Sequence, residues 1–123
     1  PQGAKRDQII TAMDWFPTVL DLCGIKQKAD SPKLDGHNIV PIIKDKKAKS
    51  NHSRLHFAWG NQWAVREGEW KLIGNVKNSN VSLHNLSDKE PETINYAKDK
   101  PNLVNHLLSL HSAWAKDVSP KRK

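Results

Sequence analysis

Four short runs between residues 54 and 86 alternate apolar and polar residues, and this pattern constrains the fold more than any other feature of the chain. The runs are RLHFAW (54–59), QWAVRE (62–67), EWKLI (69–73) and VSLHNL (81–86). A period of two is typical of strands that bury one face. Gly60-Asn61 and Gly68 are turn signals between the first three runs. The short connections therefore predict a four-stranded antiparallel meander.

A meander needs an apolar cover on one face, and the last third of the chain can supply it. Pro101 suits the first turn of a helix. Leu103, Leu107, Leu110 and Trp114 then recur at steps of four, three and four residues, which places them on one side of that helix.

A second helix is predicted over residues 12–23. Thr11 and Asp14 have the spacing of a capping box, and Gly24 suits the position that ends a helix. Apolar residues follow one face of this segment: Met13, Phe16, Val19, Leu20 and Cys23. Cys23 is therefore expected to be an inert core thiol. The predicted fold class is α+β: a four-stranded antiparallel sheet packed by a C-terminal helix and preceded by an N-terminal helix.

Composition narrows the function classes only in part. The chain has 123 residues with 20 Lys and Arg against 13 Asp and Glu, a formal charge of +7. This charge favours anionic partners, although it is dispersed enough to fit a solvated basic surface. No apolar run approaches the roughly 18 residues of a membrane span, so no membrane partner is expected. Cys23 is the only cysteine, which excludes an internal disulfide and a cysteine-based zinc site.

The motifs of common active sites are missing from the sequence. The six histidines form no HExxH pattern, and there is no Walker loop, GxSxG or GxGxxG. The residues alone therefore assign no catalytic residue and no metal ligand. Nucleic acid is a poor candidate partner, since no recognition helix or stacking platform is indicated.

Several stretches together resemble the C-terminal part of the formylglycine-dependent sulfatases. MDWFPTVLDLCGI (13–25) and LDGHNIVPII (34–43) are similar to the family's Asp-x-x-Pro-Thr-x-Leu helix and the Leu-Asp-Gly turn after it. AVREGEWKLI (64–73) is similar to its hairpin Ala-x-Arg-x-Gly-x-Trp/Tyr-Lys. LHNLSDKEPETINYA (83–97) is similar to its Leu-Tyr-Asp-Leu segment, from which His84 and Asn85 depart.

The resemblance implies a small subdomain of a larger enzyme that hydrolyses aryl or carbohydrate sulfates. Residues 1–50 would be a linker helix and loop that join the catalytic domain, and residues 51–123 would be the C-terminal subdomain. In this family the nucleophile is a formylglycine made from a Cys/Ser-x-Pro-x-Arg motif and calcium polarises the sulfate. Cys23 is followed by Gly24-Ile25-Lys26, so it does not match that motif. The chain alone is therefore expected to be inactive and to hold no cofactor, with calcium and formylglycine in the missing catalytic domain.

The resemblance leaves the compartment open among secreted, periplasmic and lysosomal, and the natural substrate undecided. The turn HFAWGNQ (56–62) is the one candidate for reaching an anionic sulfated substrate. Its side chains suited to sugar or aryl sulfate contacts are His56, Trp59, Asn61 and Gln62. The competing interpretation is that Trp59 and Trp63 only pack the sheet.

Two other functions compete with the enzyme subdomain. One is a basic, Trp-rich binding module for sulfated polysaccharide, and the other is a structural or dimerising domain. The apolar stripe of the helix over 12–23 would be exposed without a catalytic domain beside it. Self-association through that helix is therefore expected.

Overall fold

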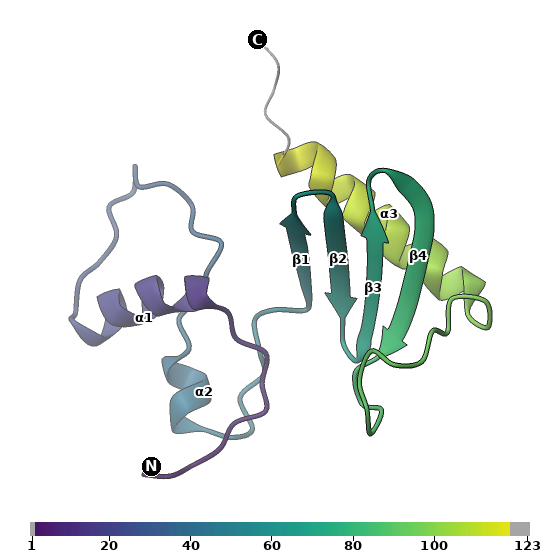
Figure 1. Cartoon of the computed structure of the whole chain (residues 1–123). Coiled ribbons are helices and arrows are strands. Elements are labelled where there is room, and N and C mark those ends of the chain that lie inside the picture. The colour runs from purple at the N-terminus through teal and green to yellow at the C-terminus, as the bar shows by residue number, and fades with distance from the viewer. Residues whose placement is uncertain (1, 119–123) are drawn as a thin grey trace. The chain divides into compact units, whose positions relative to one another are not determined.

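The computed structural model of the chain describes residues 2–118, which form two compact units (Figure 1). The first unit ends at His52 and the second begins at Ser53. This division does not test the predicted role of residues 1–50 as a linker to a catalytic domain, and that role stays a prediction.

The second unit is a four-stranded antiparallel sheet followed by one long helix, as Figure 1 shows. The strands are β1 (Arg54–Trp59), β2 (Gln62–Glu67), β3 (Trp70–Asn75) and β4 (Asn78–Asn85), and the helix is α3 (Pro101–Val118). The strand order is β1-β2-β3-β4, so each strand pairs with the next one in the chain. The predicted α+β meander with a C-terminal helix is confirmed.

Glycine turns set the register of this sheet. Trp59 pairs with Gln62 across the first turn, which leaves a loop of two residues. Gly60 and Gly68 both have a φ of +57°, a conformation that glycine adopts without strain. The turns predicted at Gly60-Asn61 and at Gly68 are confirmed.

Helix α3 covers one face of the sheet and completes the core (Figure 1). The buried core residues are Val65 of β2, Leu72 of β3 and Leu83 of β4, with Val104 and Leu107 of α3. Half-buried apolar residues pack around this cluster, among them Trp63, Trp70 and Leu110. The leucines that the helical spacing placed on one side therefore do face the sheet.

The loop between β4 and α3 is fastened to β4 by several hydrogen bonds. The Asn95 side-chain oxygen accepts the backbone N–H of Leu83 at 3.0 Å. The backbone N–H of Tyr96 donates to the carbonyl oxygen of the same leucine at 2.8 Å. The His84 ring nitrogen Nδ1 lies 2.8 Å from the Ile94 carbonyl oxygen. These bonds hold the loop in place without regular secondary structure.

The first unit contains three short helical segments: η1 (Ala12–Asp14), α1 (Trp15–Leu22) and α2 (Val40–Lys44). Together η1 and α1 confirm the helix predicted over 12–23, and Gly24 ends it with a φ of +68°. The buried side chains of this helix are polar, Asp14 and Thr18, because both bond to the backbone of neighbouring loops.

The apolar residues of α1 lie outside the core of the first unit. Met13, Phe16 and Val19 are half exposed or more. The expectation of a core thiol at Cys23 was wrong, since this residue caps the helix and is exposed. Apolar periodicity located the helix correctly but did not indicate which face the unit itself buries.

Candidate functional site

The turn between β1 and β2 presents three of the four candidate side chains to solvent. Trp59 is 88% exposed, and Asn61 and Gln62 are exposed as well. The Asn61 carbonyl oxygen accepts the backbone N–H of Val76 at 2.8 Å, which fastens this turn to the connection between β3 and β4. The turn is thus a fixed platform whose side chains remain free to contact a ligand.

A shallow groove of about 280 Å³ runs from this turn along the face of the sheet that points away from α3. It is lined by Phe57, Trp59, Gln62, Trp63, Ala64, Lys71, Ile73 and Glu92. The Lys71 ammonium lies 2.6 Å from a Glu92 carboxylate oxygen in its wall. An exposed indole beside polar groups can stack on a sugar or aryl ring and hydrogen-bond its substituents.

His56 lies on the opposite face of the sheet from this groove. It pairs with Val65, whose side chain is in the core beneath α3. Its ring stacks on Trp114 with centroids 5.0 Å apart and planes 5° from parallel. The structure therefore brings Trp59, Asn61 and Gln62 together and separates His56 from them. The period of two already predicts this separation. Successive side chains of a strand point to opposite faces, so positions 56 and 59 lie on opposite faces of β1.

The imidazole of His56 belongs to a cluster of four rings between the sheet and α3. The other members are Trp63, His111 and Trp114. Trp63 and His111 stack with centroids 4.1 Å apart and planes 14° from parallel. Burial lowers the pKa of His111, and burial followed by the charges of His111 and Arg54 lowers the pKa of His56. At neutral pH both imidazoles are therefore uncharged packing groups.

The two tryptophans weighed for this region have different roles. Trp63 packs, since it stacks on His111 and lies so close to Gly74 that a side chain there would overlap its indole. Trp59 does not pack the sheet. Sequence reasoning missed Phe57, Lys71 and Glu92 as groove residues. Lys71 stood in the quoted hairpin motif, whereas no sequence signal joins it to Glu92, 21 residues away.

The first unit contains one pairing that has the chemistry of a general-base dyad. The Nε2 atom of His52 lies 2.8 Å from both carboxylate oxygens of Asp14. Asp14 is fully buried and the His52 side chain is 8% exposed. Because the pair has no open side for a substrate, it is a structural contact rather than a reactive one.

Other kinds of site find little support in the part of the chain that the structure describes. Residues 2–118 contain no group of three His, Cys, Asp or Glu side chains that could hold a metal ion. Among the same residues, no helix is both long and apolar enough to cross a bilayer.

Comparisons with known proteins point to one family. No protein-family model matches the chain. Arylsulfatase K of Danio rerio is 31% identical over 114 residues, which cover 82% of this chain and 21% of that protein. The uncharacterized sulfatase YdeN of Escherichia coli (strain K12) is 25% identical over 144 residues, covering 86% of this chain and 25% of that protein. The chain thus spans about a quarter or less of the length of these curated relatives.

A solved structure shares the fold. It is a protein from a genetic locus of Bacteroides thetaiotaomicron for the metabolism of multiple glycosaminoglycans. Its TM-score to this chain is 0.69 at 22% sequence identity, and the match covers 91% of this chain and 26% of the other. At this identity the likeness concerns the arrangement of the helices and strands alone.

Proposed function

This chain belongs to the sulfatase family, to the C-terminal region of those proteins, and from that premise we propose that it is the non-catalytic subdomain of an enzyme that hydrolyses sulfate esters. The proposal is supported by the match of nearly the whole chain to a small part of two sulfatases. In this proposal the β2–β3 hairpin, the loop between β4 and α3 that contains Asn95, and α3 act together as a rigid support.

Catalysis in this proposal belongs to another part of the parent enzyme. The sequence contains no Cys/Ser-x-Pro-x-Arg motif from which a formylglycine could be made. Among residues 2–118 no three His, Cys, Asp or Glu side chains come together around a possible metal position, so the proposal places calcium in that other part of the enzyme as well. In this proposal the chain itself supplies no step of sulfate ester hydrolysis.

The contribution we propose for this subdomain is to substrate contacts, through the turn between β1 and β2. The observation that carries it is the 88% exposure of Trp59 at the head of the groove, with Asn61 and Gln62 beside it. An aromatic ring and two amides suit a sugar or aryl sulfate, whose ring can stack while its hydroxyl and sulfate oxygens accept hydrogen bonds. His56 would support the turn from beneath through its stacking on Trp114.

Two measurements test the family role. Sequencing upstream of the codon for Pro1 should reveal a Cys/Ser-x-Pro-x-Arg motif in the same reading frame. Purified 123-residue chain should not turn over a chromogenic aryl sulfate, with or without calcium. An open reading frame without that motif, or turnover that is lost when residues of this chain are substituted, would contradict the proposal.

A third measurement tests the substrate contact in the enzyme that contains the motif. Trp59→Ala should raise the KM for a sulfated substrate, because the stacking surface is lost, and Trp59→Phe should restore much of the affinity. Ile94→Ala removes a comparably apolar, 52% exposed side chain from the same unit and should leave KM unchanged. Equal KM values for the Trp59→Ala and Ile94→Ala enzymes would show that the turn does not reach the substrate.

A further inference from the structure

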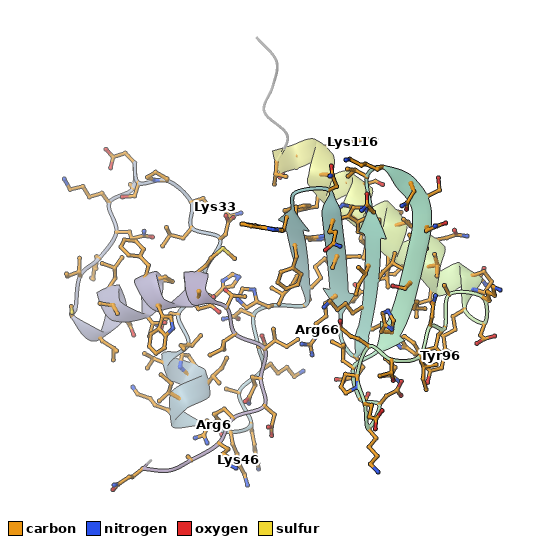
Figure 2. The ribbon with its side chains drawn as sticks, in the orientation of Figure 1. Arg6, Lys33, Lys46, Arg66, Tyr96 and Lys116 are labelled. Carbon is orange, nitrogen blue, oxygen red and sulfur yellow. The ribbon has the colours of Figure 1, made fainter. Side chains whose placement is uncertain are left out.

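Two basic segments of the first unit, far apart in the sequence, lie side by side. They are residues 5–8 (KRDQ) and residues 44–49 (KDKKAK). The Arg6 guanidinium donates to the carbonyl oxygens of Ile42 and Ile43 at 2.8 and 2.9 Å. Figure 2 shows Arg6 and Lys46 close together at one end of this unit. The arrangement is therefore built by the fold and not by local sequence alone.

The Gln8 side chain adds a second clasp between the same segments. Its amide nitrogen lies 2.7 Å from the Lys46 carbonyl oxygen and 2.8 Å from that of Ala48. The Asp45 carboxylate accepts the backbone N–H of Lys47 at 2.8 Å and tightens the turn. All of these bonds use backbone groups of the lysine-rich segment, and none of them engages a lysine ammonium group.

The joined segments concentrate the charge of the chain. Their ten residues include six basic and two acidic side chains, a net charge of +4 out of +7 for the whole protein. We call the six basic residues the basic surface: Lys5, Arg6, Lys44, Lys46, Lys47 and Lys49. The five lysines are exposed. None of them takes part in a salt bridge within the residues that the structure describes.

A hollow of about 360 Å³ lies between the two segments, lined by Lys5, Arg6, Asp7, Gln8 and Lys46. Its lining is polar and charged, unlike the aromatic groove of the second unit. The ammonium groups of Lys5 and Lys46 in this lining and the exposed lysines next to it in residues 44–49 together create a positive potential that attracts an anionic chain.

We infer that the basic surface binds a sulfated polysaccharide. Such a chain carries repeated negative charges along its length, and spaced lysines on flexible stems can follow them without a fixed geometry. The ten residues include no aromatic side chain on which a nucleic-acid base could stack. The preference for a sulfated over a phosphorylated polymer also rests on the proposed sulfatase function. The basic surface itself does not depend on it.

The binding test uses the 123-residue chain and fluorescein-labelled heparin as the sulfated probe, at several salt concentrations. The variant Lys46→Gln/Lys47→Gln/Lys49→Gln removes half of the basic surface. Its matched control, Lys26→Gln/Lys28→Gln/Lys33→Gln, removes the same charge from exposed loop positions of the same unit. Figure 2 places Lys33 across α1 from Arg6 and Lys46.

The expected result is a clear difference between these two triple variants. The first should weaken heparin binding at least about tenfold and flatten its dependence on salt, because fewer counterions are released on binding. The control should change affinity by no more than about twofold. It alters only the net charge, and salt screens charges that lie farther than a Debye length from the bound polymer. Equal losses in both variants would overturn the inference, while the tests of the sulfatase proposal would be unaffected.

Two further arms test the arrangement and the ligand class. Gln8→Ala leaves the charge unchanged but releases the clasp on residues 46 and 48, so it should weaken heparin binding. Unaltered affinity would show that the fold contributes nothing to the surface. Chemically desulfated heparin and double-stranded DNA should both bind more weakly than heparin at the same salt. DNA binding as tight as heparin binding would overturn the assignment to a sulfated polysaccharide.

Discussion

Asp14 and His52 form a buried pair in the first unit although 38 residues separate them, and the His52 Nε2 atom lies 2.8 Å from each carboxylate oxygen. The same carboxylate accepts the backbone N–H of Thr11 at 2.6 Å and of His37 at 2.7 Å. One side chain therefore joins the start of the first helix to two loops. A buried carboxylate with this many donors is stabilised as the anion.

Asp14→Asn should destabilise the first unit by about 2–4 kcal/mol, because the amide keeps the shape but loses the charge and part of the acceptor capacity. Amide hydrogen exchange at Thr11 and His37, the two backbone donors, measures the effect directly. Asp21→Asn changes an exposed carboxylate on the same helix and should leave both amides protected. Unchanged protection in the Asp14→Asn protein would refute the assigned role.

The same carboxylate makes the first unit sensitive to acid. Burial alone would raise the pKa of Asp14, but the hydrogen bonds from His37, Thr11 and His52 outweigh it and lower that pKa below 3.8. A group with a lowered folded-state pKa stabilises the fold above its unfolded pKa, and this stability is lost as the pH falls through the folded value. Protection of the Thr11 amide should therefore fall below about pH 4 in the native chain, and Asp14→Asn should abolish that pH dependence.

Gly74 and Gly68 should both resist substitution, for different reasons. A methyl group at Gly74 would overlap the Trp63 indole, which is held by its stacking on His111, so Gly74→Ala should cost about 1–3 kcal/mol by overpacking. A side chain at Gly68 meets open space, but its φ of +57° strains other residues by about 1–2 kcal/mol.

Asparagine separates the two causes, since it tolerates a positive φ. Gly68→Asn should therefore recover most of the stability lost in Gly68→Val, whereas Gly74→Asn should be worse than Gly74→Ala. Urea denaturation of the four variants gives the comparison. The prediction for Gly74 is wrong if Gly74→Ala unfolds at the native midpoint.

The strands, the helices and the turn glycines of this chain could be predicted from local pattern, because periodicity and turn chemistry act over a few residues. The core-facing side was also predictable for α3, but not for β1 or α1. In β1 the apolar residues Phe57 and Trp59 point away from α3, and His56 faces it. Burial depends on register with β2, which is a property of the assembled sheet.

Long-range polar contacts were equally hidden from sequence reasoning. Asp14 was predicted to take part in a capping box, and it does accept the Thr11 N–H, but its bond to His52 joins residues 38 positions apart that no sequence pattern links. The clasp of Arg6 on residues 42 and 43 is of the same kind. Such pairs depend on how the chain folds back, so single-residue chemistry suggests the groups but not the partners.

Trp70 and Trp59 offer a matched pair of aromatic deletions. Trp70 lies edge-on to Tyr96 with centroids 5.6 Å apart, and the Lys100 ammonium lies 5.1 Å from its ring centre. It also packs on the core, so Trp70→Ala should cost about 3–5 kcal/mol. Trp59→Ala removes an equal volume from solvent and should change stability by less than about 0.5 kcal/mol. A shared urea midpoint for both variants would contradict the faces assigned to these strands.

The ring cluster under α3 should make the second unit less stable in weak acid. The pKa values of His56 and His111 are lowered in the fold, chiefly by burial. The unfolded chain therefore binds protons more readily, so full stability is present above the unfolded pKa of 6.5 and is lost as the pH falls through the folded values.

Replacing both imidazoles removes this effect and identifies its source. His56→Phe/His111→Phe should reduce the slope of stability against pH between pH 7 and pH 5. His106→Phe serves as the control, because that imidazole is half exposed and lies 2.7 Å from the Glu67 carboxylate outside the cluster. The free energy of unfolding from urea titrations at several pH values gives the slopes. A control variant with the same flattened slope as the double variant would show that the cluster is not the cause.

Self-association through the helix predicted over 12–23 remains a prediction, and the exposure of its apolar side chains makes it testable. Met13, Trp15, Phe16 and Val19 are each at least half exposed in the first unit. A neighbouring group of exposed apolar side chains of this size is typical of a surface that another protein covers, and a second copy is one available cover. Sedimentation of the 123-residue chain should therefore show a mass that rises with concentration. Phe16→Asp should return the chain to the mass of a monomer, whereas Asp21→Asn, on the same helix, should not. A native chain that stays monomeric at every concentration would end this hypothesis.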